Sequence, residues 1–189
     1  MQPNQRTLQG SFEEALRKVT GESIRVVASG RTDAGAHAIF AFDRTGQLAL
    51  QFGSHGGGPG EFNRPTHISC GPEKTLIVAD SMNFRIQLLD LDGSPLSAFG
   101  RKGDAAGDLS LPKGVAIDPD GNIWIVDAHF ENLQAFTPDG QLLMSMGREG
   151  SAPGEFWLPA GICIDTQRRM WVADASNHRV QVFELLPSS

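Results

Sequence analysis

The chain contains no tyrosine and only two cysteines among its 189 residues. It also has no run of about 18 apolar residues, the length that a membrane-spanning helix requires. Cys70 and Cys163 are too few to form the disulfide framework of a small secreted domain, so we expect two buried free thiols. Residues 1–6 are not followed by the apolar stretch of a secretory signal. These absences predict a cytoplasmic protein that does not enter the membrane.

Basic side chains are also scarce over most of the chain, whose formal net charge is −6. Residues 1–38 hold five basic and four acidic side chains, a net charge of +1. Residues 39–189 hold 11 basic and 18 acidic side chains, a net charge of −7. Broad binding to a phosphate backbone needs a basic face. The composition therefore argues against such binding by residues 39–189, although it does not exclude a local basic patch.

What the sequence has instead is an internal repeat of 47 residues. Residues 80–89 read DSMNFRIQLL and return at 174–183 as DASNHRVQVF, with a more divergent version, DAHFENLQAF, at 127–136. Other positions keep the same spacing: Pro65, Pro112 and Pro159, and Gly53, Gly100 and Gly147. A period held by several residue types without an insertion indicates a repeat architecture.

Each repeat has the pattern of four short antiparallel strands. In the repeat over 64–109, we expect strands at 66–69, 75–79, 85–89 and 95–99, with Asp92-Gly93 as the hairpin signal before the last one. Four short strands in 40–50 residues are typical of a β-propeller blade. Residues 39–189 hold about 3.2 such periods, and closed propellers have about four to eight blades. The sequence predicts a mainly β fold with about half of a propeller ring.

The repeats resemble NHL repeats, in which a Gly-Ile-x-Asp…Asp-Gly-Asn-Ile-x-Val-Ala-Asp half precedes Asn-x-Arg-Val-Gln-Val-Phe. Residues 114–127, GVAIDPDGNIWIVD, are similar to the first half, and 177–183, NHRVQVF, to the second. The resemblance implies a partial, six-bladed-type propeller of about three blades. It also implies a non-catalytic interaction module that binds a protein, a peptide or single-stranded RNA on one loop face.

In the NHL family, an Asp and an Arg in each blade brace the turn between the second and third strands. The resemblance therefore implies two structural pairs, Asp80 with Arg85 and Asp174 with Arg179. The middle repeat has Asn132 where the arginine would stand, so we expect its turn to be looser.

Residues 1–38 do not share the period. Apolar residues spaced near four apart predict a helix that begins near Thr7 and ends at Gly21. A strand is expected at 23–29, and a polar loop, GRTDAGAHA, follows at 30–38. The sequence therefore predicts a short α/β segment ahead of the propeller repeats, with the domain boundary between residues 38 and 39.

Residues 2–38 resemble the N-terminal part of the tRNA pseudouridine synthase A family, and the loop at 30–38 is similar to its active-site signature. The resemblance implies that Asp33 is the nucleophile toward uridine and that Arg31 helps to hold the flipped nucleotide. The family's first strand, its large remaining domain and its tyrosine against the target base have no counterpart in this sequence. We therefore expect an inactive synthase fragment joined in frame to the repeats.

Two functions from different classes stay open at this point. One is a binding module over 39–189 fused to an inactive segment over 1–38. The alternative is a tRNA pseudouridine synthase that isomerises uridine in the tRNA anticodon arm, with tRNA as its partner; a propeller hydrolase or lyase is a third possibility. Because a blade normally buries both faces against its neighbours, half a ring should also self-associate through its open blades.

No cofactor and no metal site are expected. The five histidines occupy different phases of the repeat, whereas a metal site on the propeller axis would use one phase. His-Gly-Gly-Gly at 55–58 can form an oxyanion loop, but without a Gly-x-Ser-x-Gly elbow it predicts a connector between blades. DPDGN at 118–122 starts like a calcium loop, but its twelfth position is His129, which favours a hairpin turn. Trp124 and Trp171 share a phase, and we expect them to pack between blades.

Overall fold

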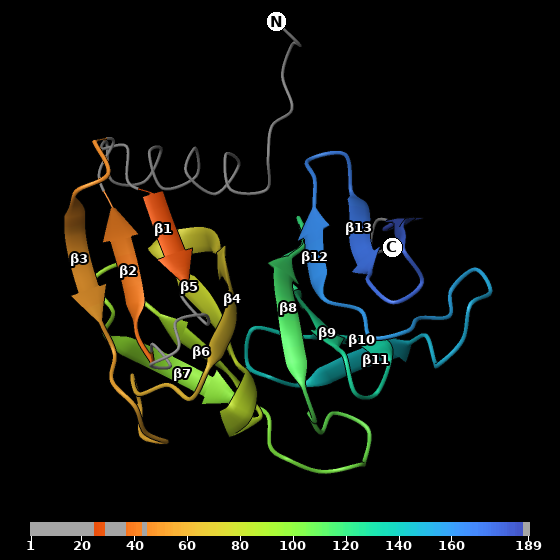
Figure 1. Cartoon of the computed structure of the whole chain (residues 1–189), viewed down its shortest axis with the longest axis horizontal. Helices are drawn as coiled ribbons and strands as arrows, with labels where there is room; N and C mark the ends of the chain where they lie inside the picture. The colour runs from red at the N-terminus through yellow and green to blue at the C-terminus, as the bar shows by residue number, and fades with distance from the viewer. Residues whose placement is uncertain (1–24, 29–36, 43–44, 187–189) are drawn as a thin grey trace, which may run out of the picture.

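The structure, a computed structural model, describes residues 25–28, 37–42 and 45–186 (Figure 1). Regular structure in these ranges consists of short strands and two 3-10 helices, η1 (Pro72–Lys74) and η2 (Ser81–Asn83). The strands are β1 (Arg25–Ala28), β2 (Ile39–Phe42), β3 (Leu48–Phe52), β4 (Pro65–Cys70), β5 (Leu76–Asp80), β6 (Arg85–Leu89), β7 (Pro95–Phe99), β8 (Pro112–Ile117), β9 (Ile123–Asp127), β10 (Asn132–Phe136), β11 (Leu142–Met146), β12 (Gly161–Ile164), β13 (Arg169–Asp174) and β14 (Arg179–Glu184). Neither helix in the described ranges is long and apolar enough to cross a membrane. The helix expected from Thr7 to Gly21 lies outside the described residues.

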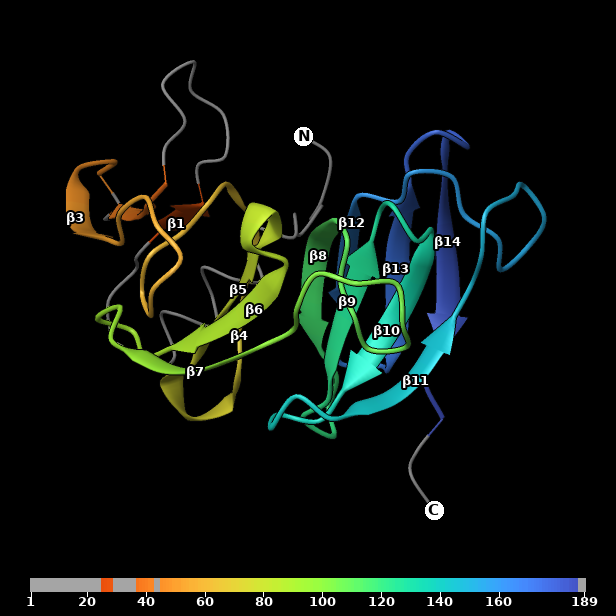
Figure 2. The ribbon, with the colours of Figure 1, turned by 90° about the horizontal axis from the view of Figure 1, so that it is seen from below.

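The strands form four antiparallel sheets that follow one another in chain order. Sheet 1 is β1-β2-β3, sheet 2 is β4-β5-β6-β7, sheet 3 is β8 to β11, and sheet 4 is β12-β13-β14. The first strands of sheets 2, 3 and 4 lie next to one another, as the innermost strands of propeller blades do (Figures 1 and 2). The prediction of a mainly β fold built from four-stranded blades is confirmed, and the sheets resemble part of a propeller.

Residue pattern explains the position of each strand in its sheet. The second strands, β5 (LIVAD) and β9 (IWIVD), are buried at every position, as central strands covered on both faces must be. The fourth strands, β7 and β11, are largely exposed at the outer edge. Gly93 turns the chain between the third and fourth strands with a φ of +91°, and a Cβ there would meet Phe52 Cγ of sheet 1 at 2.3 Å.

Strand β1 takes the place of a second strand in sheet 1. It pairs with β2 so that Arg25 faces Phe42 and Ala28 faces Ile39. One repeat later, Leu76 faces Leu89 in the same register. Residues 25–28 belong to the segment that resembles the synthase, so that segment and the first repeat strands share one sheet across the expected boundary at residue 38.

Three apolar clusters hold the sheets together, one between each successive pair. Each cluster combines one face of a sheet, the opposite face of the next sheet, and a buried residue from the connector between them: Phe62, Leu109 or Phe156. The side that packs on the next sheet along the chain is called the forward face, and the other is called the backward face. Because the sequence repeats, the same forward-to-backward interface is built three times.

Candidate binding site

The first and last repeats brace the turn after their second strand with a buried carboxylate. Asp80 is fully buried and accepts hydrogen bonds from Arg85 Nε at 2.8 Å, Asn83 Nδ2 at 2.8 Å and the Asn63 amide at 2.7 Å. Arg85 also donates to the carbonyl oxygens of the preceding connector, among them that of Glu61 at 2.8 Å. The arginine therefore ties the turn to the connector that enters the same blade.

The last repeat builds the same arrangement 94 positions later. Arg179 Nε donates to Asp174 Oδ2 at 2.7 Å, and its Nη2 donates to the Glu155 carbonyl oxygen at 2.9 Å. Burial of the Asp174 carboxylate raises its pKa, but hydrogen bonds from the Trp157 amide, Asn177 and Arg179 outweigh burial, so the net shift is downward. Asp174 therefore stays ionised at neutral pH.

The middle repeat satisfies its carboxylate without an arginine. Asp127 is fully buried and accepts hydrogen bonds only from backbone amides, including those of Ser110 at 2.7 Å and His129 at 3.0 Å. Asn132 points elsewhere and donates to Ser145 Oγ at 3.2 Å. The turn residue Glu131 has a φ of 54°, close to the 56° and 54° of its equivalents in the other repeats. The turn therefore keeps the backbone conformation of the other repeats, with amides in place of the missing guanidinium, and its looseness stays a prediction.

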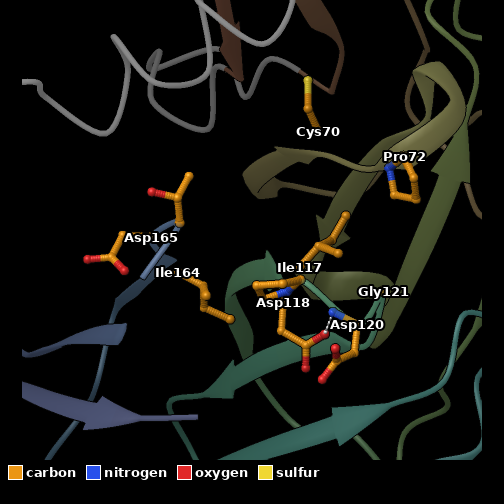
Figure 3. Close-up of a pocket in the computed structure, with 10 residues that line it drawn as sticks. Cys70, Pro72, Ile117, Asp118, Asp120, Gly121, Ile164 and Asp165 are labelled. Atoms are coloured by element: carbon orange, nitrogen blue, oxygen red, sulfur yellow. Dashed lines mark hydrogen bonds between the residues drawn. The ribbon is translucent and has the colours of Figure 1, made fainter. Parts of the chain in front are cut away.

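A hollow of about 630 Å³ lies where the loops between first and second strands meet (Figure 3). Three successive repeats contribute to it at the same phase, with Cys70, Ile117 and Ile164 as equivalent positions. Its complete lining is Cys70, Pro72, Ile117, Asp118, Pro119, Asp120, Gly121, Ile164, Asp165 and Thr166. Apolar groups and three carboxylates thus share one hollow on one end of the blades.

The carboxylate of Asp118 organises the loop of sheet 3 beside this hollow. The Gly121 amide donates to the Asp118 carbonyl at 3.0 Å, so the predicted hairpin turn at 118–122 is confirmed. The Asp118 side chain accepts hydrogen bonds from Asn122 Nδ2 and from Trp124 Nε1, both at 2.9 Å. Trp124 packs between sheets 3 and 4, as expected, but its polar end also fixes this loop. The spacing of six residues between Asp118 and Trp124 recurs in sheet 4, where Trp171 Nε1 lies 3.2 Å from Asp165 Oδ2.

The charges around the hollow are fixed by neighbouring loops. Arg168 Nη1 of sheet 4 donates to Asp120 Oδ2 of sheet 3 at 2.9 Å, which links the two loops. Burial raises the pKa of Asp165, but hydrogen bonds from Arg169, Trp171 and Gln167 outweigh burial and bring the pKa down to about 2. Burial raises the pKa of the Cys70 thiol to about 12, so this group remains protonated at neutral pH. The hollow therefore presents the ionised carboxylate of Asp165 beside an apolar, unreactive floor.

The other predicted site positions are not among the described residues that line this hollow. Asp33 and Arg31 lie outside the described residues, so their roles stay predictions. His55 belongs to a connector, because its bridge to Phe62 recurs as Lys102 with Leu109 and as Glu149 with Phe156. Within the described ranges, no three His, Cys, Asp or Glu side chains gather as a metal site would require.

Three protein families match parts of the chain. The NHL repeat matches residues 156–183, the SMP-30/Gluconolactonase/LRE-like region matches residues 71–147, and a family described as 6-bladed beta-propeller matches residues 31–99. The chain therefore carries segments of the NHL and gluconolactonase-like six-bladed propeller families.

Solved structures of low sequence identity share the fold. A virginiamycin B lyase from Staphylococcus aureus aligns with a TM-score of 0.55 at 14% identity, over 85% of this chain and 56% of the lyase chain. An auxiliary nutrient binding protein from Bacteroides thetaiotaomicron aligns with a TM-score of 0.57 at 15% identity, over 78% of this chain and 42% of that chain. At these identities the likeness establishes the fold alone.

Curated relatives match a different and much shorter part of the sequence. The tRNA pseudouridine synthase A of Caldicellulosiruptor bescii is 55% identical over 38 residues, which are 20% of this chain and 16% of the relative. That of Geobacillus kaustophilus is 62% identical over 39 residues, 20% of this chain and 15% of the relative. The chain spans about a sixth of the length of these relatives. A short segment matching this synthase is thus present.

Proposed function

We propose that residues 39–189 are a partial NHL-type propeller of about three blades that works as a peptide-binding module, preceded by a short α/β segment over 1–38 that does no catalysis here. The observation that carries this proposal is the hollow between the strand 1–2 loops. It draws equivalent positions from three repeats, and repeat proteins commonly bind on loops that stack along one face.

The chemistry of the lining selects the type of peptide. Ile117, Ile164 and Cys70 offer an apolar floor to the stem of a long side chain. Asp118 offers negative charge nearby, because its carboxylate accepts hydrogen bonds only from neutral donors, whereas Asp165 is already paired with Arg169. Lysine and arginine combine an apolar stem with a cationic end and can use both features at once. The preferred ligand is an extended peptide that inserts a basic residue flanked by apolar ones.

Charge disfavours single-stranded RNA as the ligand. A groove for single strands follows the phosphates with basic side chains and stacks the bases on aromatic ones. The lining of the hollow has neither basic nor aromatic residues, and residues 39–189 carry a net charge of −7. RNA therefore serves as the contrasting ligand in the test.

A second function, pseudouridine synthesis in tRNA, is favoured by one observation: the 55–62% identity of a segment of 38–39 residues to synthases. Holding a nucleophile against a flipped nucleotide requires a supporting shell within a fraction of an ångström. The matched segment is only 15–16% of those enzymes. We therefore rank this activity below peptide binding.

The binding proposal is tested with labelled ligands and two matched variants. Thr166→Lys places a cation in the lining of the hollow, whereas Gln167→Lys places the same charge on the adjacent exposed residue, outside the lining. Fluorescence anisotropy would compare a Leu-Lys-Leu peptide, its Leu-Glu-Leu counterpart and oligouridine. We expect only the lysine peptide to bind, and Thr166→Lys to weaken it about tenfold, equivalent to roughly 1.4 kcal/mol. Equal effects of the two variants, or tighter binding of oligouridine, would refute the proposed site.

A further inference from the structure

The forward face of sheet 4 is apolar and uncovered in the described part of the chain. Val180 and Val182 of β14 are 61% and 48% exposed, and Trp171 of β13 lies beside them because it pairs with Val182. Their equivalents 47 residues earlier, Leu133 and Ala135, are 0% and 2% exposed. The difference arises because sheet 4 covers the forward face of sheet 3, whereas no described sheet covers the forward face of sheet 4.

The repeat shows what kind of surface covers such a face. Ahead of sheet 3, the covering residues are Phe156 of the connector and Ile162, Met170 and Val172 of the backward face of sheet 4. Ahead of sheet 2, they are Leu109, Val115, Ile123 and Ile125 at the same phases. In both interfaces a forward face meets the backward face of another blade of the same repeat. We therefore expect an uncovered forward face of this composition to pack against the backward face of another sheet.

The chain has one backward face that no other described sheet covers, on sheet 1. Ile39 and Ala41 of β2 point toward sheet 2, so the alternate residues Phe40 and Phe42 lie on the opposite side, where they are half-buried. Phe42 stands at the phase of Leu89, whose side chain belongs to the backward face of sheet 2. Strand β1 completes this sheet in the register of a second strand.

We propose that a second copy of this chain covers the forward face of sheet 4 with the backward face of its own sheet 1. The reverse contact forms at the other end, so two chains close one ring. Each single contact is head-to-tail, and the twofold axis relates the two. The aligned part of this chain corresponds to 42–56% of the lyase and nutrient binding protein chains, so two copies of sheets 1 to 4 amount to about one such chain.

Oligomeric state gives the first test. Light scattering coupled to gel filtration, from one to about 50 µM, should give twice the chain mass of 20.3 kDa. Val182→Lys puts a charge into the proposed contact and should give the monomer mass. Leu143→Lys is the matched control, because Leu143 is similarly exposed (51%) but lies on the outer edge strand β11, and this variant should remain a dimer. A monomeric wild type, species that grow beyond the dimer, or a dimer unaffected by Val182→Lys would overturn the proposal.

Cysteine cross-linking then distinguishes head-to-tail from face-to-face pairing. In a background with Cys70→Ala and Cys163→Ala, one preparation carries Phe42→Cys and another carries Val182→Cys. We expect oxidation to cross-link the mixture of the two and to leave each alone uncross-linked. Cross-linking of Val182→Cys with itself would mean that two forward faces meet, and an uncross-linked mixture would mean that sheet 1 is not the partner surface. Either result would overturn the arrangement. Peptide binding at the hollow is measured separately, so its failure would not affect this outcome.

Discussion

The middle repeat and its two neighbours have the same turn conformation, but different hydrogen-bond donors stabilise it. In the first and last repeats, an arginine bridges the buried Asp80 or Asp174 to the connector. In the middle repeat, backbone amides alone surround Asp127, and the left-handed residue of the turn keeps its φ within a few degrees. A buried carboxylate needs several hydrogen-bond donors, and an arginine is one way to supply them.

The substitution in the middle repeat nevertheless leaves a defect. Glu131 Oε2 and Asn132 Oδ1 are buried without a hydrogen-bond partner, the two such side-chain atoms among the described residues. Neither defect occurs at the equivalent positions of the braced turns, which carry Phe84-Arg85 and His178-Arg179. The arginine therefore joins the turn to the connector and also avoids an orphaned polar group.

Removing the most buried brace should have the largest effect. Arg85→Ala leaves Asp80, which is fully buried, without its charged partner and also frees connector carbonyls. Loss of one member of a buried pair costs about 3–5 kcal/mol, and we expect about 3 kcal/mol because other donors to Asp80 remain. Urea unfolding followed by circular dichroism measures the change. An unfolding free energy equal to that of the wild type would show that Asp80 needs no arginine even here.

Removing the brace of the last repeat should have a smaller effect. Arg179→Ala should destabilise by about 1–3 kcal/mol, because Asp174 is buried but Arg179 is 30% exposed and more easily replaced by water. The same urea titration, run beside Arg85→Ala, gives the ranking. A larger loss for Arg179→Ala than for Arg85→Ala would contradict the dependence on burial.

Restoring the arginine in the middle repeat should change the free energy of unfolding only slightly, and should raise it rather than lower it. Asn132→Arg removes one orphaned oxygen and can donate to the carbonyls of Asp104, Ala105 and Asp108, which hold the positions of the acceptors used by Arg85. Since Asp127 already has its amide donors, we expect a change between neutral and about 1 kcal/mol of stabilisation. Differential scanning calorimetry measures the shift in Tm. A clear loss of stability would show that the amide arrangement excludes a guanidinium.

We expect the smallest effect on stability from a change in pH, through the carboxylate of Asp165. The folded pKa of Asp165 is about 2, below its ordinary 3.8, so the folded chain binds this proton more weakly than the unfolded one. The carboxylate therefore contributes its full stability above about pH 3.8 and loses it as pH falls toward 2. Thermal melts between pH 5 and pH 2 should show a steeper decline in Tm for the wild type than for Asp165→Asn. Parallel declines would show that Asp165 is not linked to folding.

Much of the fold could be predicted from local residue patterns, because the repeat shows the pattern of most strands more than once. The third strand at 85–89 and the fourth at 95–99 have the bounds that alternation and Asp92-Gly93 predict. The bond between Trp124 and Asp118 was missed, although its spacing recurs in sheet 4 and could have suggested it.

Features that depend on packing between repeats could not be predicted from local residue patterns. The hollow requires loops that stand 47 residues apart to meet, which only the stacking of blades determines. The amide set around Asp127 depends on where Ser110 and Leu111 enter the blade. The place of β1 depends on residues outside the period pairing with residues inside it, and no repeat pattern predicts that.

One assay separates a binding module from an enzyme most directly. Unmodified tRNA is incubated with the full chain and with Asp33→Ala, and pseudouridine is mapped by carbodiimide modification and primer extension. We predict no pseudouridine with either protein, because a segment that matches only 15–16% of a synthase lacks the shell that holds a nucleophile in place. Pseudouridine that forms with the wild type and disappears with Asp33→Ala would contradict this and make the chain an enzyme.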